Sequence, residues 1–138
     1  MSGHSQNKTP ASSKVNAEKR GHIAEDVAAT YLLQQGYLIR ERNWKNSKGK
    51  NEVDIIAQHG DEIIFVEVKC RTGEGDDPVA AVNARKMMKM TKAADSYLRS
   101  LPQKLFYRFD IIAFHGNPVP ENIQHFRDAF IAPITTGK

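Results

Sequence analysis

The chain has 138 residues, of which 40% are hydrophobic and only one, Cys70, is a cysteine. This length supports one core but not a catalytic domain joined to a separate recognition domain. A single cysteine excludes an intrachain disulfide and a cysteine-rich zinc site. No apolar run approaches the length of a membrane span and the N-terminus lacks a signal-like stretch, so we expect a cytoplasmic protein that does not contact membranes.

The net charge of +4 is concentrated near the N-terminus, because residues 1–20 contain four lysines and arginines against one acid and so carry +3 of it. Residues 1–17 are rich in Ser, Asn, Gln and Lys with little to bury, which predicts a disordered basic and polar tail. We expect a single domain over residues 18–131. The tail could add weak attraction to phosphates, or it could serve only for solubility.

A helix is predicted from about Glu18 to Gln35, with Gly36 as its C-cap. Glu25 lies at the edge of the apolar arc, where its carboxylate can reach a neighbouring strand, whereas Asp26 points away. The alternative for Glu25 is a solvent-facing side chain. The apolar arc consists of Ile23, Ala24, Val27, Ala28, Tyr31 and Leu32.

A first strand is predicted from Tyr37 to Trp44, followed by a polar loop over residues 45–51. The loop contains Lys45, Lys48 and Lys50, which could touch a phosphate backbone or simply be solvated.

Two further strands flank a tight turn at Gly60-Asp61, where glycine supplies the positive φ that a two-residue turn needs. This turn places Asp54 opposite Glu67 and Glu52 opposite Lys69. Because side chains alternate along a strand, these charged residues share the face that also carries Ile56 and Phe65. The opposite face is expected to be entirely core, with Val53, Ile55, Ala57, Ile64, Val66 and Val68.

Asp54 and Glu67 form a pair of opposed acids on a face that is otherwise apolar. Like charges directly opposite each other destabilise a sheet, so the pair needs a cation or a shared proton. A divalent ion with oxygen ligands, Mg²⁺ or Mn²⁺ rather than Zn²⁺, would meet this need. Lys69 follows on the same face and could hold a water or a phosphate oxygen. The alternative is an edge hairpin whose outer face is simply solvated.

The arrangement of Asp54, twelve further residues and then Glu67-x-Lys69 resembles the PD-(D/E)xK signature of restriction-endonuclease-like nucleases. The surrounding motifs are similar to those of the YraN family of small bacterial proteins, over about Arg20 to Phe114. Asn51 and Cys70 depart from that family's usual glycine and threonine. In chain order the motifs are Gly21-x-x-Ala24-Glu25, Gly36-Tyr37, Arg42-Asn43-Trp44, Glu52-Val53-Asp54-Ile55-Ile56, Phe65-Val66-Glu67-Val68-Lys69-x-Arg71 and Arg108-Phe109-Asp110.

The resemblance implies a metal site formed by Asp54, Glu67 and the carbonyl of Val68, with Glu25 as a third acid that acts directly or through water. It implies that Lys69 orients the attacking water or stabilises charge on the phosphoryl oxygens. Glu52 would tune Lys69 rather than bind metal. Similar junction-cleaving enzymes act as symmetric dimers, so a homodimer is one expected state.

A second helix is predicted from about Pro78 to Ser100, with Asp77 as its N-cap. Its buried arc is expected to contain Val79, Val82, Met87, Met90, Ala94 and Tyr97. Lys86 falls inside this apolar arc, which is unusual for a cation. A basic stripe on the other side could steer a phosphodiester backbone, or it could be a solvated face. The stripe consists of Arg85, Lys89, Lys92 and Arg99, and Arg71 precedes the helix as a further possible nucleic-acid contact.

A further strand is predicted from Leu105 to His115, and the segment from Gln124 to Ile131 gives a weak additional strand. Arg108 and Asp110 share one face, and we expect a buried ion pair that supports the sheet; the alternative is an arginine that contacts substrate. The five histidines show no ligand spacing, so no specific role is expected for them.

The order helix, three strands, helix, strand predicts an α/β fold, a restriction-endonuclease-like α/β/α sandwich with a central mixed sheet. Together with the resemblance, it indicates a metal-dependent endonuclease acting on DNA, with branched or structured DNA favoured because no aromatic platform or recognition helix is evident. The alternative is a non-catalytic module of the same fold that binds nucleic acid or a protein partner.

Overall fold

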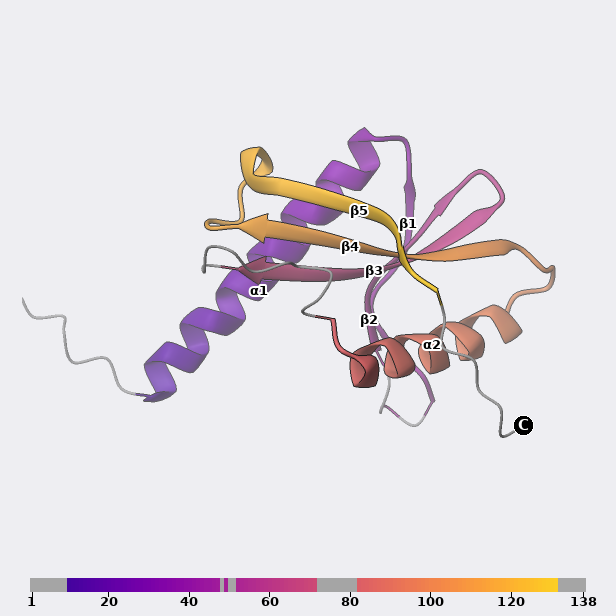
Figure 1. Ribbon diagram of the computed structural model, residues 1–138, viewed down its shortest axis with the longest axis horizontal. Coiled ribbons are helices and arrows are strands. Elements are labelled where there is room, and N and C mark those ends of the chain that lie inside the picture. Colours follow the sequence, from indigo (N-terminus) through magenta and orange to yellow (C-terminus); the bar gives the residue numbers. More distant parts are fainter. Residues whose placement is uncertain (1–9, 48, 50–51, 72–81, 132–138) are drawn as a thin grey trace, which may run out of the picture.

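The computed structural model describes residues 10–47, 49, 52–71 and 82–131, and in the first helix its side chains are described from residue 17 onward. The elements follow one another along the chain as shown in Figure 1. They are α1 (Pro10–Gln34), β1 (Leu38–Lys45), β2 (Glu52–His59), β3 (Glu62–Arg71), α2 (Ala84–Arg99), β4 (Phe106–His115), the 3-10 turn η1 (Pro120–Asn122) and β5 (Ile123–Phe130).

The strands form one mixed sheet in the order β1-β2-β3-β4-β5. Neighbouring strands are antiparallel except β3 and β4, which are parallel. A parallel pair needs a crossover connection, and α2 supplies it. The additional strand expected near the C-terminus is therefore confirmed as β5, at the edge of the sheet.

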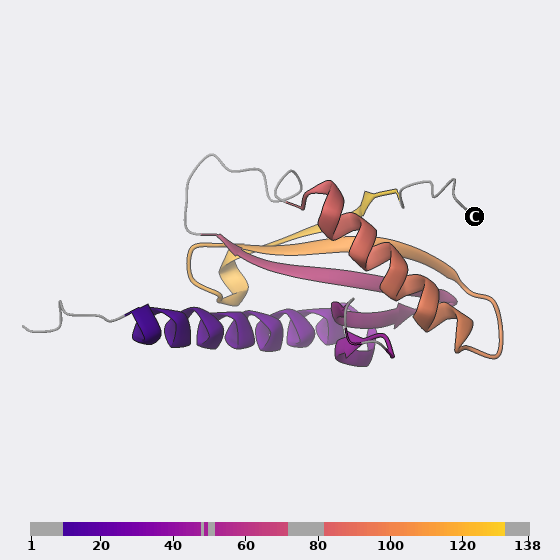
Figure 2. The same ribbon diagram turned by 90° about the horizontal axis from the view of Figure 1, so that it is seen from below.

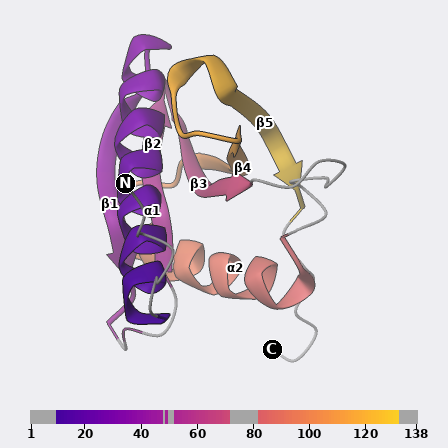
Figure 3. The same cartoon turned by 90° about the vertical axis from the view of Figure 1, so that its left-hand side faces the viewer.

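The two helices cover opposite faces of the sheet (Figures 2 and 3), which confirms the predicted α/β/α sandwich. On one face Ala24, Ala28 and Leu32 of α1 pack against the sheet, and on the other Met90 and Tyr97 of α2 do so. Strand β3 is buried from both sides, as its run of branched and aromatic residues requires. It contributes Ile64 and Val66 to the α1 face and Ile63 and Phe65 to the α2 face.

Helix α1 begins at Pro10, well before the expected start near Glu18. The helix therefore includes residues 10–17, which the sequence assigned to the tail, and residues 1–9 lie outside the described part of the chain. Proline is well suited to the first helical position, because its missing N–H is not needed there. The helix ends as predicted, because Gly36 has φ of 93° and the Tyr37 N–H bonds to the Leu32 carbonyl at 2.9 Å.

The hairpin register follows the prediction from the turn at Gly60-Asp61. His59 faces Glu62 and Ile55 faces Val66, and Gly60 has the required positive φ of 64°. Regular pairing of β2 with β3 covers Ile55 to His59, whereas β2 pairs with β1 from Glu52 to Gln58.

The observed packing and pairing correct two expectations. Val53 packs in the α2-side cluster with Ile56 and Phe65, whereas Ile55 packs in the α1-side cluster, so strict alternation does not hold between residues 53 and 55. Glu52 faces Lys45 of β1 rather than Lys69.

Helix α2 begins at Ala84 with Asn83 as its N-cap, so the expected start at Pro78 was wrong. The Asn83 side chain accepts a hydrogen bond from the Lys86 N–H at 2.9 Å. Asparagine caps a helix as well as aspartate does, so residue type alone could not decide between Asp77 and Asn83 as the N-cap. Asp77, Pro78 and Val79 lie outside the described residues, as do Lys48 and Lys50 of the basic loop. Across the parts of the chain that are described, no helix has the length and apolarity to cross a bilayer.

Candidate active site

Asp54 lies at the point where β2 and β3 separate. Its Oδ2 accepts a hydrogen bond from the backbone N–H of Val68 at 2.8 Å, and this bond spans the position where regular strand pairing has ended. The carboxylate is therefore fixed beside β3 and next to Glu67, as the hairpin register predicted. That Asp54 also satisfies a backbone donor could not be predicted from the sequence.

Glu67 is the most unusual carboxylate near this point, because it is only 4% exposed and lacks full hydrogen bonding. Its Oε1 is buried without a hydrogen-bond partner. Two ammonium groups approach it: Lys69 Nζ lies 3.5 Å from Oε2 and Lys86 Nζ lies 3.4 Å from Oε1. These are ion pairs rather than well-formed hydrogen bonds. The site thus holds a buried acceptor that a further cation or donor could satisfy.

The two acids shift each other's protonation. Burial, and secondly the charge of Asp54, raise the pKa of Glu67 to about 7, against the opposing effects of Lys86 and Lys69. Burial also raises the pKa of Asp54, although the Val68 N–H and Lys86 counteract it. The pair therefore favours a bound proton or cation near neutral pH, as predicted for opposed carboxylates.

Glu25 of α1 approaches the same point from the other side of the hairpin. Its Oε1 accepts a hydrogen bond from Asn43 Nδ2 at 2.9 Å and lies 3.6 Å from Arg42 Nη2. Burial and the charge of Asp54 raise the pKa of Glu25, which shows that the two acids are electrostatically linked. Asn43 adopts a left-handed φ of 51°, which asparagine tolerates. Sequence reasoning gave Asn43 no role, and an asparagine inside a predicted strand was the available signal.

A polar pocket of about 280 Å³ adjoins Glu67 on the α2 side. Lys86 and Lys89, both selected from the sequence, line it from the first two turns of α2. The position of Lys86 within the apolar arc is explained by its ion pair with Glu67. The other lining residues are Glu67, Lys69, Asn83 and Arg85.

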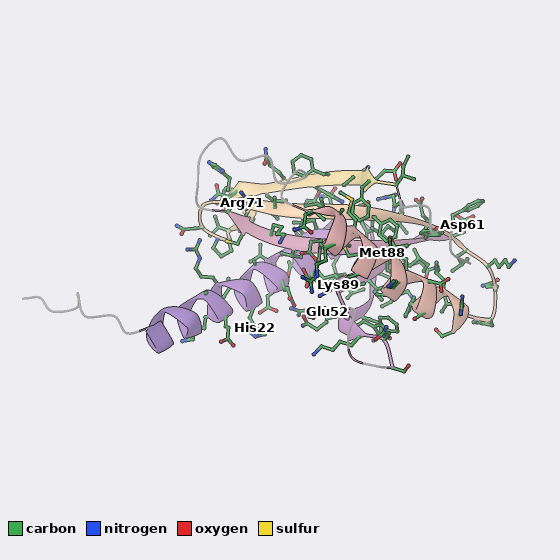
Figure 4. All side chains as sticks on the ribbon, turned by 60° about the horizontal axis from the view of Figure 1, so that its bottom comes forward. His22, Glu52, Asp61, Arg71, Met88 and Lys89 are labelled. Carbon is green, nitrogen blue, oxygen red and sulfur yellow. The ribbon has the colours of Figure 1, made fainter. Side chains whose placement is uncertain are left out.

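Glu52 and Arg71 are not brought into this acid pair. The charge of Glu52 contributes to the raised pKa of Asp54, but its strand partner is Lys45. Arg71 lies at the far end of β3 from the Asp61 turn, as Figure 4 shows, and its carbonyl accepts the Gly116 N–H. The same view shows Lys89 on α2 and Glu52 at the beginning of β2.

Arg108 belongs to a separate buried network. Its guanidinium contacts Asp110 at 2.9 Å, Glu62 at 2.8 Å and the Tyr37 hydroxyl at 2.8 Å. The predicted buried ion pair is thus present. Because the guanidinium is bonded to these side chains of the sheet, its donors are used within the fold rather than for a ligand. His125 completes the network at 2.7 Å from Asp110, so the expectation that no histidine has a specific role was wrong.

The donor set suits a hard divalent ion only in part. Asp54 and Glu67 offer carboxylate oxygens, including the unsatisfied Oε1, and this chemistry fits Mg²⁺ or Mn²⁺. Yet no three His, Cys, Asp or Glu side chains within the described ranges gather closely enough to hold an ion by themselves. One oxygen of the third candidate acid, Glu25, is already bonded by Asn43.

An α/β/α sandwich whose central hairpin carries the buried Glu67 and the partly buried Asp54 next to a lysine is consistent with a nuclease-like α/β fold. The family model of the uncharacterised protein family UPF0102 matches residues 24–114. The chain therefore belongs to UPF0102, the YraN family that its motifs resemble. The family's description names no activity.

Relatives in several bacteria match four-fifths or more of the chain. A UPF0102 protein of Phocaeicola vulgatus is 41% identical over 115 residues, which are 83% of this chain and 93% of the relative. One from Caldanaerobacter subterraneus subsp. tengcongensis is 40% identical over 122 residues, covering 85% and 98%. One from Rhodococcus opacus is 43% identical over 115 residues, covering 80% and 94%.

Proposed function

We propose that this protein is a metal-dependent phosphodiesterase that acts on DNA. The observation that supports this most is the unsatisfied Oε1 of Glu67, buried beside Asp54 and flanked by two lysines. A structural carboxylate at this depth would be expected to have its acceptors filled. A buried, under-bonded acid next to a second acid is instead typical of a site that awaits a ligand.

Asp54, Glu67 and the carbonyl of Val68 would hold Mg²⁺ or Mn²⁺, and Glu25 would bind one of its waters. When bound, the ion would lower the pKa of a water and neutralise charge on the phosphoryl group. The Val68 N–H already fixes the orientation of the Asp54 carboxylate, so the protein holds this ligand in place before binding.

Lys69 would position the attacking water or stabilise charge on the phosphoryl oxygens. Its side chain is one-third exposed and its ammonium lies 3.5 Å from Glu67, so it can reach both the acid and a ligand in solvent. Lys89 and Arg85 line the adjoining pocket and would contact backbone phosphates, which carry no sequence information. Branched or otherwise structured DNA is accordingly the favoured substrate, with a homodimer as the form that cuts two opposed strands.

One observation favours the alternative of a non-catalytic module. Glu25 is already bonded by Asn43, and Glu67 is paired with two lysines of the chain itself. A protein that only binds nucleic acid would keep the same pairs and would need no metal.

The deciding experiment is a cleavage assay on branched, flapped, single-stranded and linear DNA with Mg²⁺ or Mn²⁺. Asp54→Asn should abolish cleavage, while Asp61→Asn in the exposed turn should not. The proposal also requires a metal-dependent rise in melting temperature that Asp54→Asn removes. DNA binding without either cleavage or a metal effect would support the non-catalytic module instead.

A further inference from the structure

Lys86 is a partly buried cation of α2 that lies beside the packed side of the helix. The buried residues of α2 include Met90 and Ala93, whereas Arg85 and Lys92 are exposed. The side chain of Lys86 is only 28% exposed, against 80% for Arg99 at the other end of the helix. A lysine in this position loses hydration, so a specific negative partner must hold it there.

That partner is the acid pair. The ammonium lies 3.4 Å from Glu67 Oε1, and its charge acts on Asp54 as well as on Glu67. Nevertheless the contact does not make a hydrogen bond to Oε1. Lys86 therefore supplies charge to both acids without saturating either one, which is the role that a bound ion would otherwise perform.

A divalent ion and this ammonium cannot share the position. Two cations within a few ångströms repel strongly where little water separates them. Lys86 has a flexible four-carbon stem, and the pocket of about 280 Å³ beside it offers space toward Lys89 and Arg85. An ammonium displaced from Glu67 would thus move toward a place where an anion is favoured.

We propose that the Lys86 ammonium occupies the cation position beside Glu67 in the metal-free protein, and that a divalent ion displaces it into the neighbouring pocket, where it binds a phosphate oxygen of the substrate. This inference rests on the proposed function and adds a positioning residue to it. Metal binding then prepares the phosphate pocket, and the two ligands favour each other's binding. By thermodynamic reciprocity, phosphate must strengthen metal binding by the same factor.

The test compares Lys86→Met with Lys92→Met, an exposed lysine of the same helix that does not line the pocket. Mn²⁺ binding is measured by calorimetry in the absence of nucleic acid. Lys86→Met should bind Mn²⁺ about 5- to 150-fold more tightly than wild type, the usual range for coupled sites. Lys92→Met should bind as wild type does. Equal or weaker Mn²⁺ binding by Lys86→Met would overturn the inference.

The second half of the test uses inorganic phosphate in the presence of Mg²⁺. Lys86→Met should bind phosphate more weakly than wild type, although it binds the metal more tightly, and Lys92→Met should not change. A lysine that moves between the two positions should change the affinities for Mn²⁺ and phosphate in opposite directions when it is replaced. Loss of a merely structural lysine would weaken the binding of both ligands. Unchanged phosphate affinity in Lys86→Met would also overturn the inference.

A further variant keeps the test valid if Lys86→Met does not fold. Lys86→Gln retains a donor for Glu67 but loses the charge, so it should fold and still bind Mn²⁺ more tightly than wild type. If wild type binds no divalent ion at all, the proposed function fails together with this inference. If wild type binds Mn²⁺ and cleaves DNA but Lys86→Gln binds Mn²⁺ no more tightly, only the role of Lys86 fails.

Discussion

Two buried carboxylates on adjacent strands, Asp110 of β4 and Glu67 of β3, have opposite electrostatic surroundings. Asp110 is bonded by Arg108, His125 and the Asp128 N–H, with distances of 2.7 to 3.1 Å. These bonds lower the pKa of Asp110 in spite of its burial. Glu67 is nearly as buried, but its pKa is raised and one of its oxygens lacks a hydrogen bond.

The difference shows that burial alone does not distinguish a structural acid from a functional one. What separates them is the number of donors that reach the carboxylate. Asp110 stabilises the junction of β4, β5 and α1, where His125 also contacts the Tyr31 hydroxyl at 3.0 Å. Glu67 instead retains unused bonding capacity at the edge of a pocket, which is the condition for binding something else.

Removing the structural acid should have the largest effect on stability. Asp110→Ala leaves the buried Arg108 guanidinium and the Asp128 N–H without their acceptor, so unfolding in urea should show a loss of about 3–5 kcal/mol. Asp61→Ala in the exposed turn serves as the control and should stay within about 0.5 kcal/mol. A loss below about 1 kcal/mol for Asp110→Ala would mean that the network does not stabilise the fold.

Next to Glu67, the largest expected effect is on the rate of DNA cleavage, when Lys69 is replaced. Lys69→Ala should retain Mn²⁺ binding but reduce DNA cleavage by about 10²–10³, because one transition-state contact is removed after the ion is in place. Lys104→Ala changes an exposed lysine outside the site and should cleave normally. Equal rates for Lys69→Ala and wild type would contradict the assigned role of Lys69.

The pH dependence of stability should reveal Glu67 directly. Its pKa is raised from 4.5 to about 7 on folding, so the native state holds a proton that the unfolded chain releases. The contribution of Glu67 to the free energy of unfolding of the metal-free protein is therefore fully present below pH 4.5. It is lost as pH rises through 7, and the total loss is up to about 3 kcal/mol. Glu67→Gln should remove this slope, and the difference between the two urea-unfolding profiles measures it. Parallel profiles would show that Glu67 titrates normally.

The smallest effect is expected at Asp54. Asp54→Asn relieves repulsion with Glu67 and keeps an acceptor for the Val68 N–H, so the metal-free protein should be at least as stable as wild type. Asp54→Ala loses that acceptor as well and should be about 1 kcal/mol less stable than Asp54→Asn. Both should lose the metal-dependent rise in melting temperature. A large loss of stability for Asp54→Asn would place Asp54 with Asp110 among the structural acids.

Much of this arrangement could be predicted because it depends on local rules. The turn at Gly60-Asp61 determined the hairpin register, and that register brought Asp54 to Glu67. The spacing of Arg108 and Asp110 on one strand likewise predicted their ion pair. The misplaced position of Lys86 in an apolar arc was visible in the sequence, although its partner was not.

The remaining features depend on contacts between distant segments. No periodicity indicates that Asn43 bonds Glu25, or that His125 reaches both Asp110 and Tyr31. Glu52 pairs with Lys45 because β1 pairs with the whole of β2, and the regular pairing of β2 with β3 does not extend to residues 52–54, which strand alternation cannot foresee. Similarly, the start of α1 at Pro10 concerns residues whose composition suits an exposed helix as well as a coil.

The parallel pairing of β3 with β4 has a consequence for how the protein folds. The two acids belong to a single hairpin, and hairpins form within about 1–10 μs. Lys86 reaches Glu67 only when the crossover helix closes onto the sheet, and such non-local closure is much slower. We therefore expect Asp54 and Glu67 to meet before Lys86 arrives, when only Lys69 of the same hairpin offsets their repulsion in that early folding step.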